Sequence, residues 1–67
     1  MMQDLKEPTQ ETIEDAAKTP GTHYFVVEPW KLSAVRTALY AKVADTSHNC
    51  HTSYNGVRRT LRVVISD

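Results

Sequence analysis

The sequence has a single cysteine, two glycines and one phenylalanine among 67 residues, and no long hydrophobic run. A lone cysteine excludes a disulfide within the chain and is more typical of a reducing compartment than of a secreted scaffold. No apolar stretch approaches the roughly 20 residues that cross a bilayer. The polar first residues are unlike a signal peptide. We therefore expect a cytoplasmic protein without a membrane segment.

The chain also lacks the length for a large core. Its 67 residues make one small domain, and at this size a single core is of marginal stability. Such domains usually need very regular packing, a cross-link such as a disulfide, or a partner subunit. Residues 1–8 have little apolar content and are expected to be flexible. The predicted domain therefore covers residues 9–67.

Charge is balanced in sum but not along the chain. The formal net charge is zero, yet residues 1–28 hold six acidic side chains and two lysines, whereas residues 29–67 hold six basic and two acidic side chains. This separation predicts either a basic binding surface or two halves that attract each other within the fold.

The first half of the chain predicts a short helix and a strand. The helix covers 9–18, with Thr9 as a candidate N-cap whose hydroxyl accepts from a free backbone N–H. Pro20 and Gly21 end it. The strand covers 22–28 and has apolar residues on both faces, which indicates a strand covered at least in part on both sides.

The strongest helical pattern covers residues 29–44, where Pro29 suits the first turn. Its apolar stripe consists of Leu32, Val35, Leu39 and Val43. The alanines expected to widen this stripe toward a sheet are Ala34, Ala38 and Ala41. Trp30, at the entrance of the helix, is expected to act as a lid on the core.

A β-hairpin is predicted at the C-terminal end, because Asn55-Gly56 favours a two-residue type I′ turn. This turn joins strands at 49–54 and 57–65 and sets Tyr54 opposite Val57. The predicted core face carries Cys50, Thr52, Tyr54, Val57, Arg59, Leu61, Val63 and Ile65, with Arg59 near its rim. The other face is polar and basic.

Together these patterns predict an α+β domain of order α-β-α-β-β. We expect a three-stranded, mainly antiparallel sheet with both helices packed on one face and the last strand at the centre.

The segment "SHNCHTSYNG" concentrates the residues that carry chemistry. Cys50 and His51 are adjacent on a strand and point to opposite faces, so they do not converge as zinc ligands do. His48 is a formal base for Cys50, but no orienting group or oxyanion donor can be identified. We therefore predict a structural Cys50, no metal site, no cofactor and no enzymatic activity.

The leading hypothesis is a small regulatory or accessory protein that acts by binding another protein, inhibitor-like and of the kind found on phages and other mobile elements. One device is the exposed edge strand at 49–54, which would pair with another strand or with a second copy. The other is an acidic segment that would meet a basic surface, formed by Glu11, Glu14 and Asp15.

The alternative hypothesis is weak nucleic-acid binding by the basic face of the hairpin. The candidate residues are Arg58, Arg59, Arg62 and His51. Guanidinium groups with neighbouring hydroxyls suit phosphate contacts. A net charge of zero and so few bases imply weak, salt-sensitive binding. A solvated face that protects the hairpin from aggregation explains the same charges without a ligand.

Overall fold

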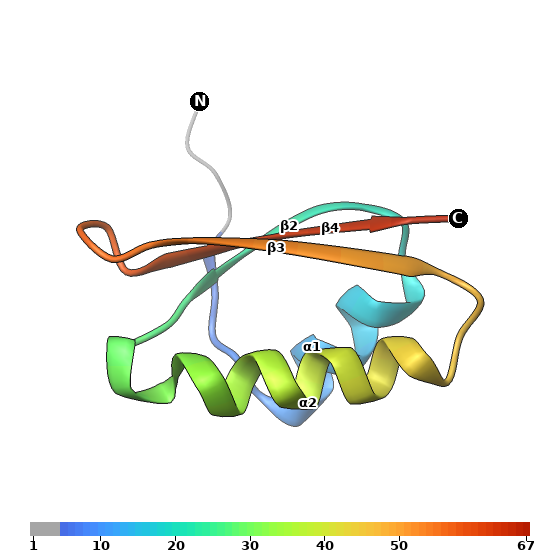
Figure 1. Cartoon of the computed structure of the whole chain (residues 1–67), viewed down its shortest axis with the longest axis horizontal. Coiled ribbons are helices and arrows are strands. Elements are labelled where there is room, and N and C mark those ends of the chain that lie inside the picture. The colour runs from blue at the N-terminus through green and yellow to red at the C-terminus, as the bar shows by residue number, and fades with distance from the viewer. Residues whose placement is uncertain (1–4) are drawn as a thin grey trace.

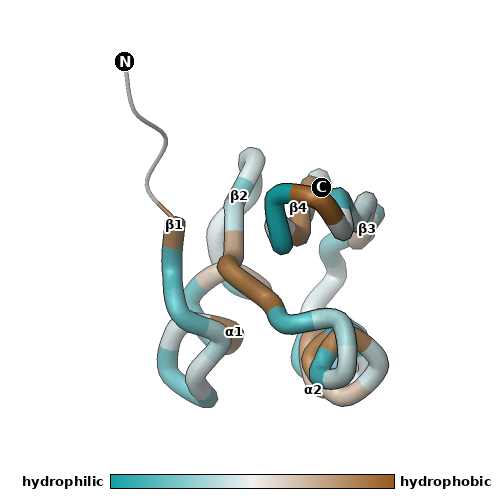
Figure 2. The backbone as a smooth tube through the Cα atoms, turned by 90° about the vertical axis from the view of Figure 1, so that its left-hand side faces the viewer, coloured by the Kyte–Doolittle hydropathy of each residue, from teal (hydrophilic) through white to brown (hydrophobic). Residues whose placement is uncertain are grey.

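Two helices cover one face of a four-stranded sheet and leave the other face open (Figures 1 and 2). The computed structural model describes residues 5–67. The elements in chain order are β1 (Leu5–Lys6), α1 (Gln10–Lys18), β2 (Gly21–Val26), the 3₁₀ turn η1 (Pro29–Lys31), α2 (Leu32–Ala44), β3 (Asn49–Asn55) and β4 (Thr60–Ser66). The α+β class and the C-terminal hairpin of β3 and β4 are therefore confirmed.

The sheet has four strands, in the order β1-β2-β4-β3, where three were expected. The additional strand β1 runs parallel to β2, with Leu5 beside Tyr24 and Lys6 beside Phe25, and the other two pairings are antiparallel. β1 comes from the segment expected to be flexible, and residues 1–4 of that segment lie outside the described residues. A strand of two residues has no periodicity that a sequence pattern can reveal.

Helix α1 begins where the sequence predicted. The Thr9 hydroxyl accepts from the backbone N–H of Thr12 at 3.2 Å, and the Thr12 hydroxyl accepts from the Thr9 N–H at 2.9 Å. These reciprocal bonds form a capping box and satisfy two free donors of the first turn. Ile13, Ala16 and Ala17 are the buried residues of this helix.

Helix α2 packs through the predicted stripe, with Val35, Leu39 and Val43 buried and Leu32 half-buried. The expected roles of the alanines were wrong, because Ala34, Ala38 and Ala41 are exposed. The sheet and α1 cover only part of this helix, so a narrow stripe is buried and the three alanines face solvent. Trp30 is not a lid on the core either, since 74% of it is exposed. No helix within residues 5–67 is long and apolar enough to cross a membrane.

The hairpin has a longer loop than predicted. Tyr54 lies opposite Leu61 and not Val57, so residues 56–59 form a four-residue connection in place of a two-residue turn at 55–56. The register moves by four residues, an even number, and every remaining strand residue therefore keeps its predicted face.

Local hydrogen bonds explain the longer loop. The Asn55 side-chain oxygen accepts from the backbone N–H groups of Val57 and Arg58, at 3.1 and 3.2 Å. Such Asn-centred bonds stabilise a turn that starts at the asparagine itself. The left-handed residue of the loop is Arg59, with a φ of 53°, and Gly56 does not have a positive φ.

The core lies between the helices and the sheet. Leu61, Val63 and Ile65 of β4 are at most 2% exposed, which confirms that the last strand is central. The second face of β2 is covered only in part: Phe25 is 1% exposed, whereas Tyr24 is half-buried and Val26 is 36% exposed on the opposite face.

Candidate binding surfaces

Among residues 5–67, no layer covers the open face of the sheet, which lies opposite the two helices (Figure 2). The strand registers set side chains in rows across it. The central row consists of Leu5, Tyr24, Arg62 and Ser53, and the rows beside it are Val26, Thr60, Asn55 and Thr22, Val64, His51. The open face therefore carries apolar, aromatic and basic side chains among hydroxyl and amide groups.

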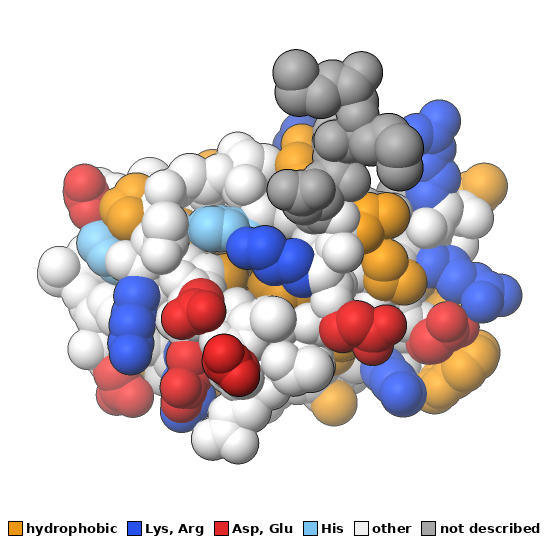
Figure 3. Space-filling view, turned by 180° about the vertical axis from the view of Figure 1, so that it is seen from behind, with side chains coloured by type: hydrophobic (Ala, Val, Ile, Leu, Met, Phe, Trp, Pro, Cys, Tyr) orange, Lys and Arg blue, Asp and Glu red, His pale blue; other side chains and the backbone are white. Residues whose placement is uncertain are grey.

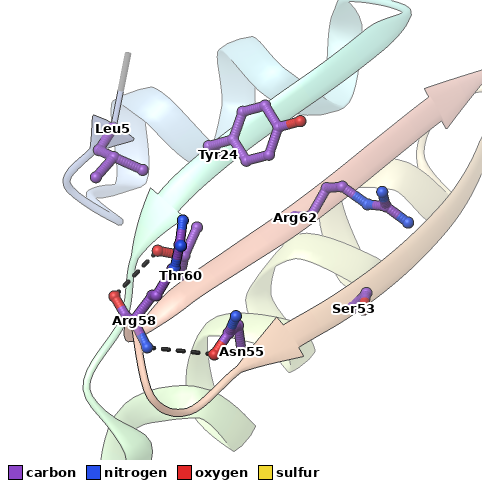
Figure 4. Close-up of a pocket in the computed structure, with 7 residues that line it drawn as sticks. All are labelled: Leu5, Tyr24, Ser53, Asn55, Arg58, Thr60 and Arg62. Atoms are coloured by element: carbon purple, nitrogen blue, oxygen red, sulfur yellow. Dashed lines mark hydrogen bonds between the residues drawn. The ribbon is translucent and has the colours of Figure 1, made fainter. Parts of the chain in front are cut away.

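A shallow concavity of about 560 Å³ occupies this face (Figure 4). Its lining residues are Leu5, Tyr24, Ser53, Asn55, Arg58, Thr60 and Arg62. Within residues 5–67, no acidic side chain is among them. The concavity combines an exposed leucine, a tyrosine ring and two guanidinium groups, which can donate hydrogen bonds to carboxylate or phosphate groups.

The structure brings Arg58 and Arg62 together, although they lie on different kinds of element. Arg62 is a strand residue of β4, between Tyr24 and Ser53 on the neighbouring strands. Arg58 belongs to the hairpin loop, where its carbonyl accepts from the Thr60 hydroxyl at 3.0 Å. The loop therefore places the Arg58 side chain over the end of the sheet (Figure 4).

Arg59 and His51 lie outside the concavity. The Arg59 Nη1 atom is 3.0 Å from Glu28 Oε2, and the Arg59 carbonyl accepts from the Val27 N–H at 2.8 Å. Its expected position on the core face of a strand was wrong, because the four-residue loop takes it out of β4. His51 is exposed on the open face beside Val64.

The sequence interpretation missed Leu5 and Tyr24 as members of this surface. Alternation along β2 does place Tyr24 and Val26 on one face, but it does not say which face the helices cover. Leu5 joins them only because β1 pairs with β2. No local signal in the sequence predicts that pairing.

The acidic segment on α1 is partly engaged within the fold. Glu14 Oε1 lies 2.8 Å from Lys42 Nζ on α2, while Glu11 and Asp15 are exposed. Acidic side chains gather over the helix layer, with basic ones among them (Figure 3). The two pairs Glu14–Lys42 and Glu28–Arg59 join the acidic half of the chain to the basic half, and this confirms attraction between the halves.

The Glu14–Lys42 pair shifts both ionisations in the direction that favours folding. The hydrogen bond and the charge of Lys42 lower the pKa of Glu14, and Glu14 in turn raises the pKa of Lys42. The stabilisation is therefore present at neutral pH. It is lost when the pH falls through the pKa of Glu14 or rises through that of Lys42. Because both groups are exposed, the contribution is small.

The residues of the histidine–cysteine segment point in different directions. Cys50 is half-buried against the core, whereas its neighbour His51 is exposed on the opposite face. His48 Nδ1 lies 2.8 Å from Asp67 Oδ1, an ion-pair distance without the angles of a hydrogen bond. Within residues 5–67, no three His, Cys, Asp or Glu side chains form a group that could hold a metal ion.

We expect Cys50 to react slowly in the native protein. Burial raises the pKa of the Cys50 thiol, and thiol reagents are attacked by the thiolate. Labelling by a chromogenic disulfide should be slow in buffer and fast in denaturant. As a control, S53C in a C50S background places an exposed thiol on the same strand and should label rapidly. Native Cys50 labelling as fast as that control would contradict its burial.

A second hollow, of about 380 Å³, runs beside α2. Its lining residues are Pro29, Leu32, Ser33, Arg36, Thr37 and Tyr40. The Tyr40 hydroxyl lies 3.0 Å from the Thr52 hydroxyl in the middle of β3, and this contact ties the helix to the outermost strand. The hollow is therefore next to the free edge of the sheet.

Comparison with protein family models, with curated proteins and with solved structures finds no match to this chain. Inference about function therefore rests on the surfaces of the chain itself.

Proposed function

We propose that this chain is a small non-enzymatic accessory or regulatory protein that binds another protein through the open face of its sheet. The observation that carries the proposal is the composition of that face. A leucine and a tyrosine lie there with two guanidinium groups, and among residues 5–67 no acidic side chain lines the concavity.

This composition fits the centre of a protein interface. Tyrosine and arginine are enriched at interface centres and among the residues that dominate binding energy. Leu5 is 49% exposed and Val26 is 36% exposed, beside Tyr24. An apolar side chain of a partner would bury these residues, and the resulting exclusion of water would strengthen the polar contacts around them.

The basic groups of the face define the charge of the partner. Neither Arg58 nor Arg62 forms an ion pair with an acidic group of residues 5–67, in contrast to Arg59, which pairs with Glu28. An acidic side chain on the partner would complete bidentate hydrogen bonds to either guanidinium. We therefore propose a partner surface with an apolar anchor and adjacent carboxylates.

A second candidate ligand is single-stranded nucleic acid. Tyr24 and Arg62 are direct neighbours on β2 and β4, so a base stacked on the tyrosine would bring a phosphate near the guanidinium. Only two arginines lie in the concavity, and so few phosphate contacts give weak binding that falls steeply with salt. The weakness expected for nucleic-acid binding favours a protein partner.

Capture of partners by the tagged protein from lysate, with and without nuclease, tests the proposal. We expect a protein to be retained in both conditions, and R58E with R62E to reduce its retention about tenfold or more. The matched control is K18E with K31E, which makes the same change of charge at exposed positions on the helix layer and should retain the protein. Circular dichroism verifies that both double variants fold.

Two results would argue against this function. Equal retention by R58E/R62E and by the control would exclude the open face as the binding surface. Loss of retention after nuclease treatment would instead indicate that nucleic acid, and not a protein, binds the same arginines.

A further inference from the structure

The sequence contains one Asn-Gly pair, Asn55-Gly56, and it lies where strand β3 passes into the hairpin loop. Both residues are exposed to solvent. Asn55 lines the open-face concavity together with Arg58 and Arg62 (Figure 4). Asn55 therefore combines a side-chain amide that its neighbour in the chain can attack with a position inside the proposed binding surface.

The chain itself supplies the nucleophile for this amide. The backbone nitrogen of Gly56, once deprotonated, can attack Cγ of Asn55 and close a succinimide ring, and such an intramolecular reaction has a high effective concentration. Gly56 has no side chain that would hinder the approach. Its N–H donates to no group of residues 5–67. No hydrogen bond within the described chain therefore has to break before this nitrogen reacts.

The loop also supplies hydrogen-bond donors where negative charge develops. The attack converts the Asn55 side-chain oxygen into an oxyanion. This oxygen already accepts from the backbone N–H groups of Val57 and Arg58, at 3.1 and 3.2 Å. Donors that are held in place before the reaction stabilise the charge of a tetrahedral intermediate. Because these donors belong to the folded loop, unfolding removes them.

We propose that Asn55 is a self-modification site, at which the folded loop promotes deamidation of the side chain. The Gly56 nitrogen loses its proton and forms a bond to Cγ. The bond from Cγ to the side-chain nitrogen then breaks, and that nitrogen takes up a proton and leaves as ammonia. Water opens the succinimide, and its addition at Cγ leaves aspartate, whereas its addition at the main-chain carbonyl leaves isoaspartate. No oxidant or reductant is needed, and water is the only co-reactant.

The product changes the charge of the concavity. A carboxylate replaces the neutral acceptor of the Val57 and Arg58 N–H groups, and hydrogen bonds to a charged acceptor are the stronger ones. The new carboxylate lies in the same concavity as the Arg58 and Arg62 guanidinium groups. This consequence rests on the proposed function: the carboxylate would compete with the acidic groups of the partner for both arginines and repel them. Deamidation would therefore limit the time for which the surface binds.

Incubation of the purified full chain at neutral and at mildly alkaline pH, followed by peptide mass spectrometry, tests the modification. We expect deamidation at Asn55 to accelerate with pH, because the attacking nitrogen is deprotonated. It should be about tenfold or more faster than at Asn49, which is exposed but is followed by Cys50. The same chain in urea keeps the Asn-Gly pair and loses the two loop donors, so it should react more slowly than the native protein.

The matched variant is G56A, whose added Cβ makes only an ordinary contact with Tyr54. It should remain folded by circular dichroism and deamidate about tenfold or more slowly than the wild type. A native rate at Asn55 that is equal to or below the rate in urea overturns the proposal, because the loop would then protect the amide. The proposal is equally overturned if Asn49 reacts as fast as Asn55, or if folded G56A reacts as fast as the wild type.

N55D carries the product of the reaction and tests its effect on binding. Its midpoint of urea unfolding should be no lower than that of the wild type, and it should retain severalfold less of the captured protein. The control is Q10E, which makes the same change from amide to carboxylate at an exposed position of α1. If N55D retains the partner as well as Q10E does, deamidation does not regulate the surface. A wild type that retains no protein refutes the proposed function, whereas the mass measurement still decides whether Asn55 modifies itself.

Discussion

Replacement of Leu61 by alanine should destabilise the protein by about 2–5 kcal/mol, the range for a fully buried leucine that leaves a cavity. Leu61 is 0% exposed in the central strand β4. A domain of 67 residues has a total stability of roughly 3–10 kcal/mol at the usual value per residue. The substitution therefore removes a large part of the free energy of unfolding, and a sizeable unfolded fraction is expected at 25 °C.

Val57→Ala is the matched control for Leu61→Ala. Val57 is 95% exposed in the hairpin loop, so its truncation should change the free energy of unfolding by less than about 0.5 kcal/mol. A two-residue turn would instead set Val57 opposite Tyr54 on the core face. Urea unfolding followed by circular dichroism measures both variants. Comparable losses for the two would contradict the four-residue loop and its register.

The second large effect is expected at Gly21, where β2 begins. Its φ of 131° is a conformation that only glycine adopts readily. A Cβ at this position would meet no atom within 4 Å, so the cost of Gly21→Ala is conformational rather than steric. We expect a loss of about 1–3 kcal/mol in the free energy of unfolding, the range for a residue held in a strained backbone region.

Gly56→Ala provides the comparison for Gly21→Ala. Gly56 does not have a positive φ, and its Cβ would lie 3.7 Å from a ring carbon of Tyr54, an ordinary contact. The substitution should therefore be neutral or should stabilise by up to about 1 kcal/mol, because alanine restricts the unfolded chain more than glycine does. If Gly56→Ala proves the costlier of the two, the turn at 55–56 requires the positive φ values of type I′.

Sequence patterns were most informative where a structure depends on neighbours in the chain. The capping role of Thr9 and the stripe at Val35, Leu39 and Val43 are local, and both are confirmed. The hairpin shows the limit of such patterns. Asn55-Gly56 indicated a turn at the correct place, but the side chain of Asn55 closes a longer loop. The faces of both strands were still correct, because the register error was an even number.

The candidate surface was predictable only in part, because local patterns do not reveal contacts between distant segments of the chain. Arg62 was placed on the polar face by alternation alone. Arg59 lies in the hairpin loop and not in the predicted strand, and it pairs with Glu28, a residue 31 positions earlier in the chain. Tyr24 and Leu5 belong to the surface through strand pairing, which joins segments that no short-range pattern connects.

The sequence by itself determined the class of the fold, the order of its helices and of the hairpin strands, and the alternation that separates core from surface on β3 and β4. These properties follow from backbone preferences and from the periods of helix and strand, which act over a few residues. Only the tertiary structure decided which face of β2 is open and that Leu5 and Lys6 add a strand. These properties depend on which segments pair across the sheet, and that choice is made by the burial of the whole core.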